Sequence, residues 1–482
     1  MRNKKKEWIF LFVCLLLGIL AEVSFLHGEI GVAYIIFIAA FYTVLFIRFR
    51  FSFEHRRIGL LMMLGIWVLA ASYLLYDSTL FYYLNIVAIP AVVFFHIVLI
   101  TSPGSLNWSK LSFVKLVTSK LLDALKFLTD YLSYIIKKIM RSRKRGNNGI
   151  IQQVMLGIVL AVPLLFVIIQ LLMSADEAFR QFVQRMFYFP TERNIVEIGF
   201  RIAFILIATL FFFCVFKVLE KKTKREINQS VSVRDFPAPM AATVLILLNA
   251  VYLLFIAVQF QYFFHDGLHE GFTYAGYARR GFFELILVTL INWIVLLGFL
   301  KRVKDEGLRT KRLLQILNSL LIVTSGILLL SSWNRLTLYE EVYGFTMDRL
   351  LAHSFMVFLI LIFAYTLIRV WLENLPILHF YLISAFLFYT LLNAVNLEEI
   401  IVENNLERYE TTGKIDIHYL NLLGAEGTKG LIALYEQEPD YPELKLLLID
   451  KKERLIDMND DSWQSFNFAR KKAEKLLMEL EL

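Results

Sequence analysis

Long runs of uncharged, apolar residues recur along almost the whole chain. Residues 149–175 and 236–265 contain no Asp, Glu, Lys or Arg, and several further runs share this property. A helix needs about 20 apolar residues to cross about 30 Å of hydrocarbon. We therefore predict eleven spans, all helical, because an open sheet edge in lipid would leave backbone groups unpaired. The predicted spans cover residues 8–26, 30–48, 58–76, 80–100, 150–173, 196–218, 240–263, 281–300, 313–332, 349–369 and 375–396.

Composition leads to the same class. The 482 residues are 58% hydrophobic and include 43 Phe, whereas soluble domains are about 45–50% apolar. We predict an all-α fold, a polytopic transmembrane helix bundle of about 11 spans with a small helical C-terminal domain. Cys14 and Cys214 both fall inside predicted spans, so they are interpreted as small apolar residues rather than as a disulfide or a metal site.

The distribution of Lys and Arg predicts sidedness. With the N-terminus in the cytoplasm, the inner segments hold 31 of the 50 Lys and Arg residues, the outer segments hold 8, and the tail after residue 396 holds 11. Cytoplasmic loops carry an excess of Lys and Arg. The bias therefore predicts a cytoplasmic N-terminus and, with eleven spans, an extracytoplasmic tail.

One segment between predicted spans has the pattern of an amphipathic helix. Apolar residues recur three or four positions apart from Val114 to Ile139, and the segment ends in a basic run at residues 141–145. Two interpretations are open: a helix that lies on the inner leaflet and binds anionic lipids along residues 106–145, or a basic connector without lipid preference.

The tail, residues 397–482, is acidic, with 19 Asp and Glu against 11 Lys and Arg. Helical patterns occur around residues 415–423, 427–437, 442–457 and 462–480, and Asp460 and Asp461 are the predicted cap of the last helix. The chain thus divides into four predicted parts. They are a four-span segment (1–105), the basic amphipathic segment (106–148), a seven-span core (149–396) and an acidic helical extramembrane tail (397–482).

Candidate chemistry lies in the segments predicted to face outward. Asp176 and Glu177 are adjacent carboxylates at a membrane exit, which suits cation binding or acid–base work; the alternative is a capping box formed by Ser174 and Glu177. Two His and two carboxylates within residues 265–270 suggest a metal. The glycines in and after that run disfavour one rigid helix, so solvated loop histidines are the simpler interpretation.

A set of charged residues at outer span ends forms the main site hypothesis. We predict that they converge on one outward-facing polar pocket that binds an anion, because Arg at membrane depth needs a carboxylate or an anionic ligand. The set is Arg279, Arg280, Glu284, Arg335 and Arg349, with Tyr339, Glu340 and Asp348 as secondary candidates beside Asp176 and Glu177. The alternatives are an Arg280–Glu284 helical ion pair and simple interfacial anchoring of the segment 333–350.

Several of these segments resemble an uncharacterised bacterial membrane family, catalogued as domain of unknown function 4173, with a related 4153 group. The similar segments are Ser174–Phe179, Tyr274–Leu285, Arg335–Leu350 and the tail pattern Trp463…Asn467-Phe-Ala-Arg470…Ala473. The similarity spans roughly residues 150–480. It implies a multi-pass protein of the bacterial plasma membrane, and it supplies no activity.

Three classes of function remain. A binding, signalling or partner-scaffolding protein would use the outer polar site and the tail. A small-molecule or ion transporter needs polar groups at mid-membrane or broken spans, and an envelope-modifying enzyme needs a convergent acid, base and nucleophile. Charges inside the predicted spans are few, which favours the first class. No catalytic residue can be assigned. We expect no cofactor, metal or nucleic acid; the expected partners are the lipid bilayer and a protein.

Overall fold

The computed structural model describes residues 2–50, 53–141, 172, 176, 179, 195–220, 236–264, 282–302, 307–457 and 462–482. Ten helices in this part of the chain are long and apolar enough to cross a membrane, and each overlaps a predicted span. The eleventh predicted span, residues 150–173, lies outside the described residues. The fold is all-α, with helices and no strand elements in the described ranges. The protein is therefore a multi-pass membrane protein, as the sequence predicts.

The chain forms two compact units. Unit 1 comprises Met1–Leu61, Ala91–Lys224 and Asp460–Phe466, and unit 2 comprises Met62–Pro90, Arg225–Asn459 and Asn467–Leu482. The helices of unit 1 include α1 (Arg2–Leu26), α2 (Val32–Phe49), α5 (Leu111–Arg141) and α8 (Ile195–Glu220). Helix α1 packs against both α2 and α8.

Charged side chains at the two ends of unit 1 are paired. At one end of α1, Arg48 lies 2.5 Å from Glu220 and Lys217 lies 2.6 Å from Glu7. At the other end, Glu22 is buried and its carboxylate lies 3.5 Å from the guanidinium of Arg201. Pairing offsets part of the cost of removing these charges from water.

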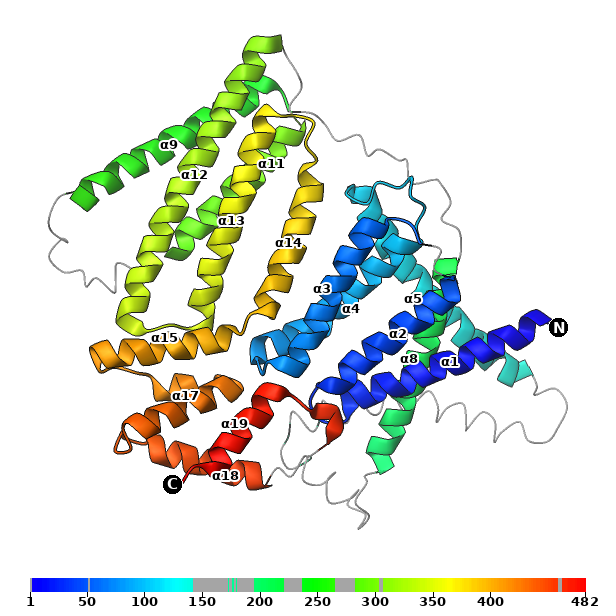
Figure 1. Ribbon diagram of the computed structural model, residues 1–482. Helices are drawn as coiled ribbons and strands as arrows, with labels where there is room; N and C mark the ends of the chain where they lie inside the picture. Colours follow the sequence, from blue (N-terminus) through cyan, green and yellow to red (C-terminus); the bar gives the residue numbers. More distant parts are fainter. Residues whose placement is uncertain are drawn as a thin grey trace. The chain divides into compact units, whose positions relative to one another are not determined.

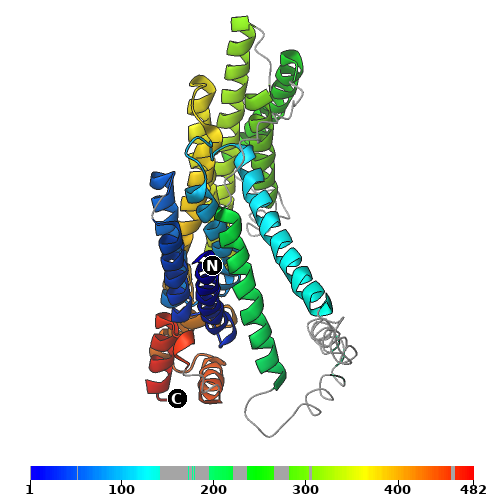
Figure 2. The ribbon, with the colours of Figure 1, turned by 90° about the vertical axis from the view of Figure 1, so that its right-hand side faces the viewer.

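Helix α5 confirms the predicted amphipathic helix, but the face that it buries is not the predicted apolar stripe. The buried face, which packs along α8, comprises Phe113, Leu116, Lys120 and Ala124. Figure 2 shows α5 and α8 side by side. Lys120 is buried because its ammonium donates to the carbonyl of Val218 at 3.1 Å. The predicted apolar stripe, represented by Val114, Leu121 and Leu125, remains exposed. Anionic-lipid binding by this helix stays a prediction.

Unit 2 contains most of the remaining spans. They are most of α3 (Arg56–Leu75), the start of α4 (Thr79–Thr101), α9 (Ala238–Phe264), α11 (Phe282–Arg302), α12 (Gly307–Tyr343), α13 (Met347–Trp371) and α14 (Ile377–Ala394). Figure 1 shows α12, α13 and α14 side by side, with α15 across their ends. Helix α12 is longer than its predicted span, 313–332, because the polar segment after Trp333 continues the same helix for about three turns.

Buried amides join spans of unit 2 to one another. The Asn249 side chain in α9 donates to the carbonyl of Leu317 in α12 at 3.0 Å. Asn292 in α11 donates to Ser325 in α12 at 2.9 Å and accepts from Tyr252 in α9 at 2.7 Å. Interhelical hydrogen bonds stabilise packing where lipid provides no hydrophobic driving force. The three helices are thus linked at several depths by polar contacts.

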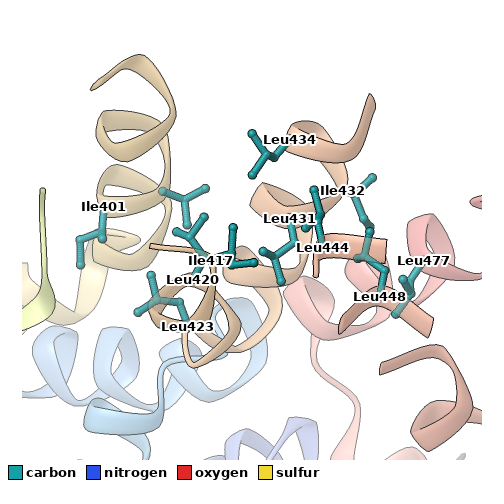
Figure 3. Close-up of a cluster of buried hydrophobic side chains, with 11 residues drawn as sticks. Ile401, Ile417, Leu420, Leu423, Leu431, Ile432, Leu434, Leu444, Leu448 and Leu477 are labelled. Carbon is teal, nitrogen blue, oxygen red and sulfur yellow. The ribbon is translucent and has the colours of Figure 1, made fainter. Parts of the chain in front are cut away.

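The tail folds into five helices with their own core. They are α15 (Leu397–Thr412), α16 (Ile417–Asn421), α17 (Gly424–Gln437), α18 (Leu444–Asp457) and α19 (Phe468–Glu479). The four predicted helical patterns correspond to α16–α19, whereas α15 was not predicted. Leucine and isoleucine side chains from all five helices form one buried cluster (Figure 3). Phe345 and Met347, at the turn between α12 and α13, pack against this cluster, so the core includes a turn between spans.

The predicted cap of the last helix is wrong. Helix α19 begins at Phe468, and its cap is Asn467, whose side-chain oxygen accepts from the N–H of Arg470 at 3.0 Å. Asp460 and Asp461 lie outside the described residues. The cap shifts because the short 3₁₀ helix η2 (Trp463–Ser465) separates that acidic pair from α19. The division of the chain at residues 105, 148 and 396 remains a proposal.

The tail contacts two turns between spans, and we therefore expect both turns on one side of the membrane. Within unit 2, the tail touches the α3–α4 turn through Asp77 and the α12–α13 turn through Asn405. Between these turns the chain passes through α4, α8, α9, α11 and α12, five described spans. A chain that starts and ends on one face of the membrane crosses it an even number of times. Five crossings would be odd, and the predicted span at 150–173 would supply the crossing that makes the number even.

Single-cysteine labelling tests this topology. In a chain carrying Cys14→Ala and Cys214→Ala, we expect Thr411→Cys to react with an impermeant maleimide in intact, wall-stripped cells. Ser105→Cys should react only after permeabilisation, because the Lys and Arg bias places it inside. Both positions are exposed. The opposite result would invert the orientation, and labelling of both positions from one side would show that residues 150–173 do not cross.

Candidate functional site

The turn between α12 and α13 is the centre of the candidate site. Helix α12 ends at Tyr343, and Gly344 follows with φ of +82°, a conformation that glycine adopts without steric cost. A Cβ at this position would lie 2.5 Å from the side-chain oxygen of Asn405. Thr346 then precedes α13. Three residues, 344–346, thus reverse the chain between two spans, and both the backbone conformation and the close neighbour require Gly344.

Helices of the tail clamp this turn through side-chain hydrogen bonds. Asn405 in α15 accepts from the N–H of Phe345 and donates to its carbonyl, each at 2.9 Å. Arg408, one turn further along α15, donates to the carbonyls of Glu341 at 3.0 Å and Val342 at 2.6 Å. These carbonyls belong to the last turn of α12, where no helical partner exists for them. A cation beside a helix C-terminus also suits the helix dipole.

Tyr419 in α16 completes the clamp. Its hydroxyl accepts from the N–H of Met347, the first residue of α13, at 2.7 Å. Burial raises the pKa of this hydroxyl, so it stays a neutral acceptor at physiological pH. The tail therefore binds the end of α12, the turn itself and the start of α13.

Two of the predicted site residues interact with each other at the turn. The guanidinium of Arg349 stacks 4.3 Å from the ring centre of Tyr339 and donates to the carbonyl of Gly344. Tyr339 also packs against Tyr343, with ring centres 4.7 Å apart. Arg349 thus serves the C-terminus of α12 in this structure. Its predicted role as an anion ligand remains a proposal.

A buried acid–base pair lies beneath the turn. Glu340 in α12 is 4% exposed, and its Oε2 lies 3.0 Å from Nε2 of His353 in α13. The Trp333 ring packs edge-on against the His353 ring at 4.3 Å. The second oxygen of Glu340 is buried without a hydrogen-bond partner in the described part of the chain. A buried carboxylate oxygen in this state costs free energy, which marks the pair as a site for a proton or another donor.

The other predicted residues lie on separate helices or outside the described ranges. Arg335 is 9% exposed in α12, and its position at membrane depth remains a prediction. Glu284 and Asp348 are exposed in the first turns of α11 and α13. Arg279, Arg280, Glu177 and the histidine-rich residues 265–270 lie outside the described residues, so convergence of the five-residue pocket remains a proposal.

Asp176 has a structural contact. Its side-chain oxygen accepts from the N–H of Phe179 at 2.9 Å. A side-chain acceptor three residues before an N–H is the geometry of a helix cap. The sequence predicted a cap in this segment and assigned it to Ser174, which lies outside the described residues.

The sequence did not predict the residues that organise the site, which are His353, Asn405, Arg408 and Tyr419. Gly344 was the residue of the sequence that could have indicated this turn, since a glycine after a long helical pattern is typical of a C-terminal cap. The tail residues gave no signal, because they lie about 60–70 positions along the chain from the groups they bind.

The chemistry that this arrangement supports is hydrogen bonding. The Glu340 carboxylate and the His353 ring lie within hydrogen-bond distance across two helices, and the second carboxylate oxygen can accept from a further donor. In the described ranges, no group of three His, Cys, Asp or Glu side chains is placed to hold a metal ion.

A matched pair of asparagine variants tests the clamp. Asn405→Ala removes both hydrogen bonds to Phe345 and leaves those backbone groups unpaired, so we expect the free energy of unfolding to fall by about 1–3 kcal/mol. Asn404→Ala is the control, because Asn404 donates only within its own helix, to Ile400. Mixed-micelle denaturation curves measure both. Equal stability of the two variants would refute the clamp.

Comparison with known proteins identifies the family. The family model described as Domain of unknown function (DUF4153) matches residues 63–434, more than half of the chain. The match begins within α3, so it includes α4 and extends further towards the N-terminus than the expected similarity, and it ends before the tail pattern at Trp463–Ala473. No curated protein and no solved structure matches the chain. The Glu340–His353 pair and the α15 clamp lie within the matched residues, and the chain belongs to the DUF4153 family.

Proposed function

We propose that the protein is a binding and signalling protein of the bacterial plasma membrane, with the α12–α13 turn and the tail on the outer face. In this proposal the Glu340–His353 pair at the end of the spans responds to a bound proton or hydrogen-bond donor. The response passes through the turn to the tail, which presents it to a protein partner.

The clamp on the α12–α13 turn carries the proposal. Asn405, Arg408 and Tyr419 bind backbone groups on both sides of Gly344. Phe345 and Met347 of the same turn pack against the apolar core of the tail. Polar and apolar contacts therefore connect the span ends to the tail, and a shift of α12 against α13 changes the surface on which α15 rests.

The Glu340–His353 pair is placed to cause such a shift. The two residues lie on different helices, and their side chains are 95% and 87% buried. Ionisable residues buried at membrane depth are costly and serve mainly functional sites. A change in the charge of either partner alters the attraction between α12 and α13 in a medium of low dielectric constant.

An exchange experiment on the full chain in lipid nanodiscs tests the coupling. Glu340→Gln keeps the shape of the side chain and removes its charge, so it weakens attraction to His353. We expect the rate of hydrogen exchange of the backbone amides in α15 to change by about fivefold or more. This change corresponds to a coupling free energy of about 1 kcal/mol between the Glu340–His353 pair and α15. Mass spectrometry of peptides covering Leu397–Thr412 provides the measurement.

The neighbouring residue supplies the control. Glu341 lies on the exposed face of the same turn of α12, and only its backbone carbonyl contacts Arg408. Glu341→Gln should therefore leave exchange in α15 unchanged. If Glu340→Gln also leaves it unchanged, the site and the tail are not coupled and the signalling function fails.

A transporter is the second candidate, favoured by the buried polar groups between spans. The amides of Asn249 and Asn292 and the Glu340–His353 pair place polar side chains at several depths of unit 2. Such groups can line a pathway for protons or polar solutes. This function and the signalling function predict different behaviour in a closed membrane.

Proton flux into liposomes distinguishes the two functions. Pyranine-loaded proteoliposomes under a potassium diffusion potential report proton entry directly. The signalling proposal predicts no flux above that of protein-free liposomes, because a proton that only binds does not cross. A flux that Glu340→Gln abolishes would overturn that proposal in favour of transport.

A further inference from the structure

The tail contacts the α3–α4 turn through polar groups of α17 and α19, and a second buried carboxyl, Glu398, lies at this junction. Asp77 in this turn accepts from the N–H of Ala425, at the start of α17, at 3.1 Å. Its other carboxylate oxygen lies 2.7 Å from the guanidinium of Arg470 in α19. Asn467, the cap of α19, donates to the carbonyls of Tyr73 and Tyr76 at 3.0 and 2.8 Å. Two helices of the tail thus hold the turn.

Three carboxyl groups gather at this junction, and two cations serve them. Arg470 pairs with Asp77, and Lys429 lies 2.7 Å from Glu426 in α17. Glu398, in the first turn of α15, is 4% exposed. In the described part of the chain no Lys or Arg lies within ion-pair distance of it.

The remaining neighbours of Glu398 do not supply a cation. Asn396 uses its side-chain amide on Glu426, at 3.0 Å. The phenol of Tyr419 in α16 stays neutral, since its pKa is raised. Lys451 in α18 donates to the carbonyl of Asn421 at 3.5 Å, and its ammonium interacts with Asp77 and Asp450. The cations near the junction therefore interact with other carboxyls, and in the described ranges none of them forms an ion pair with Glu398.

Physical chemistry favours a proton on that carboxyl. Ionising a buried acid without a partner costs several kcal/mol, and the negative charges of Asp77 and Glu426 add repulsion. The pKa of Glu398 is raised to about 7: burial is the largest cause, Asp77 and Glu426 act in the same direction, and the Ser78 hydroxyl and the Thr79 N–H act in the opposite direction. The group thus changes its charge near neutral pH.

We propose that Glu398 is a proton-binding site that latches the tail onto the α3–α4 turn. The protonated carboxyl fits the buried junction, and its ionised form repels Asp77 and Glu426 and loosens the contact. This site is separate from the Glu340–His353 pair and does not depend on the function proposed for that pair.

The sign of the pH dependence follows from the raised pKa. The ordinary value is 4.5, and the folded junction holds its proton up to about pH 7. Between these values the latched state binds more protons than the open state, so latching weakens as pH rises. The full contribution of the Glu398 proton to the stability of the latched state is present below pH 4.5, and it is lost once the pH passes about 7. Over this window the latching equilibrium changes by up to about two orders of magnitude.

Hydrogen exchange of the full chain in nanodiscs measures the latch. Protection factors, which correct for the pH dependence of intrinsic exchange, are compared at about pH 6 and about pH 8.5. For peptides that cover residues 424–430, we expect at least a tenfold loss of protection in the unmodified protein. Glu398→Gln, which cannot ionise, should keep its protection at both pH values.

Two further variants keep the test decisive. Glu403→Gln alters an exposed carboxylate on the same helix, and it should lose protection as the unmodified protein does. Ser78→Ala removes a hydroxyl that lowers the pKa of Glu398, so it should move the transition to higher pH; this variant serves if Glu398→Gln fails to fold.

Two outcomes would overturn the proposal. The first is the same pH dependence in Glu398→Gln as in the unmodified protein, which would assign the change to other groups, such as His418 in α16. The second is protection that depends on added calcium and is lost with a chelator, which would make the three carboxyls a cation site instead.

Discussion

Helix ends that lack backbone partners constrain this protein more than any single contact does. A helix leaves its last carbonyls unpaired, and a short turn between two spans leaves little room for water or side chains to pair them. Here the tail provides the partners. Asn467 donates to the carbonyls at the end of α3, and Arg408 donates to those at the end of α12. The position of the tail on these turns follows from that requirement.

The same constraint explains why the tail is more than an appended domain. Its apolar core receives Phe345 and Met347 from the α12–α13 turn, so burial of that core and capping of the helix ends occur together. Gly424, at the start of α17, has a positive φ and faces the backbone carbonyl of Asp77. A side chain there would separate α17 from the α3–α4 turn. Close backbone approach, capping and apolar burial thus act on the same few turns.

The two buried glutamates at these turns have different neighbours. Glu340 has a histidine partner on the neighbouring span, so the contact joins two helices. Glu398 has two neighbouring carboxyls that pair with cations of their own, and burial is the main cause that raises its pKa to about 7. Both place a titratable group where a helix of the membrane region meets another element. A change of charge at either position therefore acts on helix packing rather than on solvent-exposed surface.

The sequence by itself determined the membrane class, ten described spans and the helices α16–α19, because the length and period of an apolar run are local properties. It did not predict α15, whose charged residues resemble any solvated helix, or the cap at Asn467. Only the tertiary structure decided that Asn405 meets Phe345, that Glu340 meets His353 and that Asp77 meets Ala425. These pairs depend on where the tail folds back and on which face of each helix meets its neighbour, and neither is encoded in the spacing of residues along the chain.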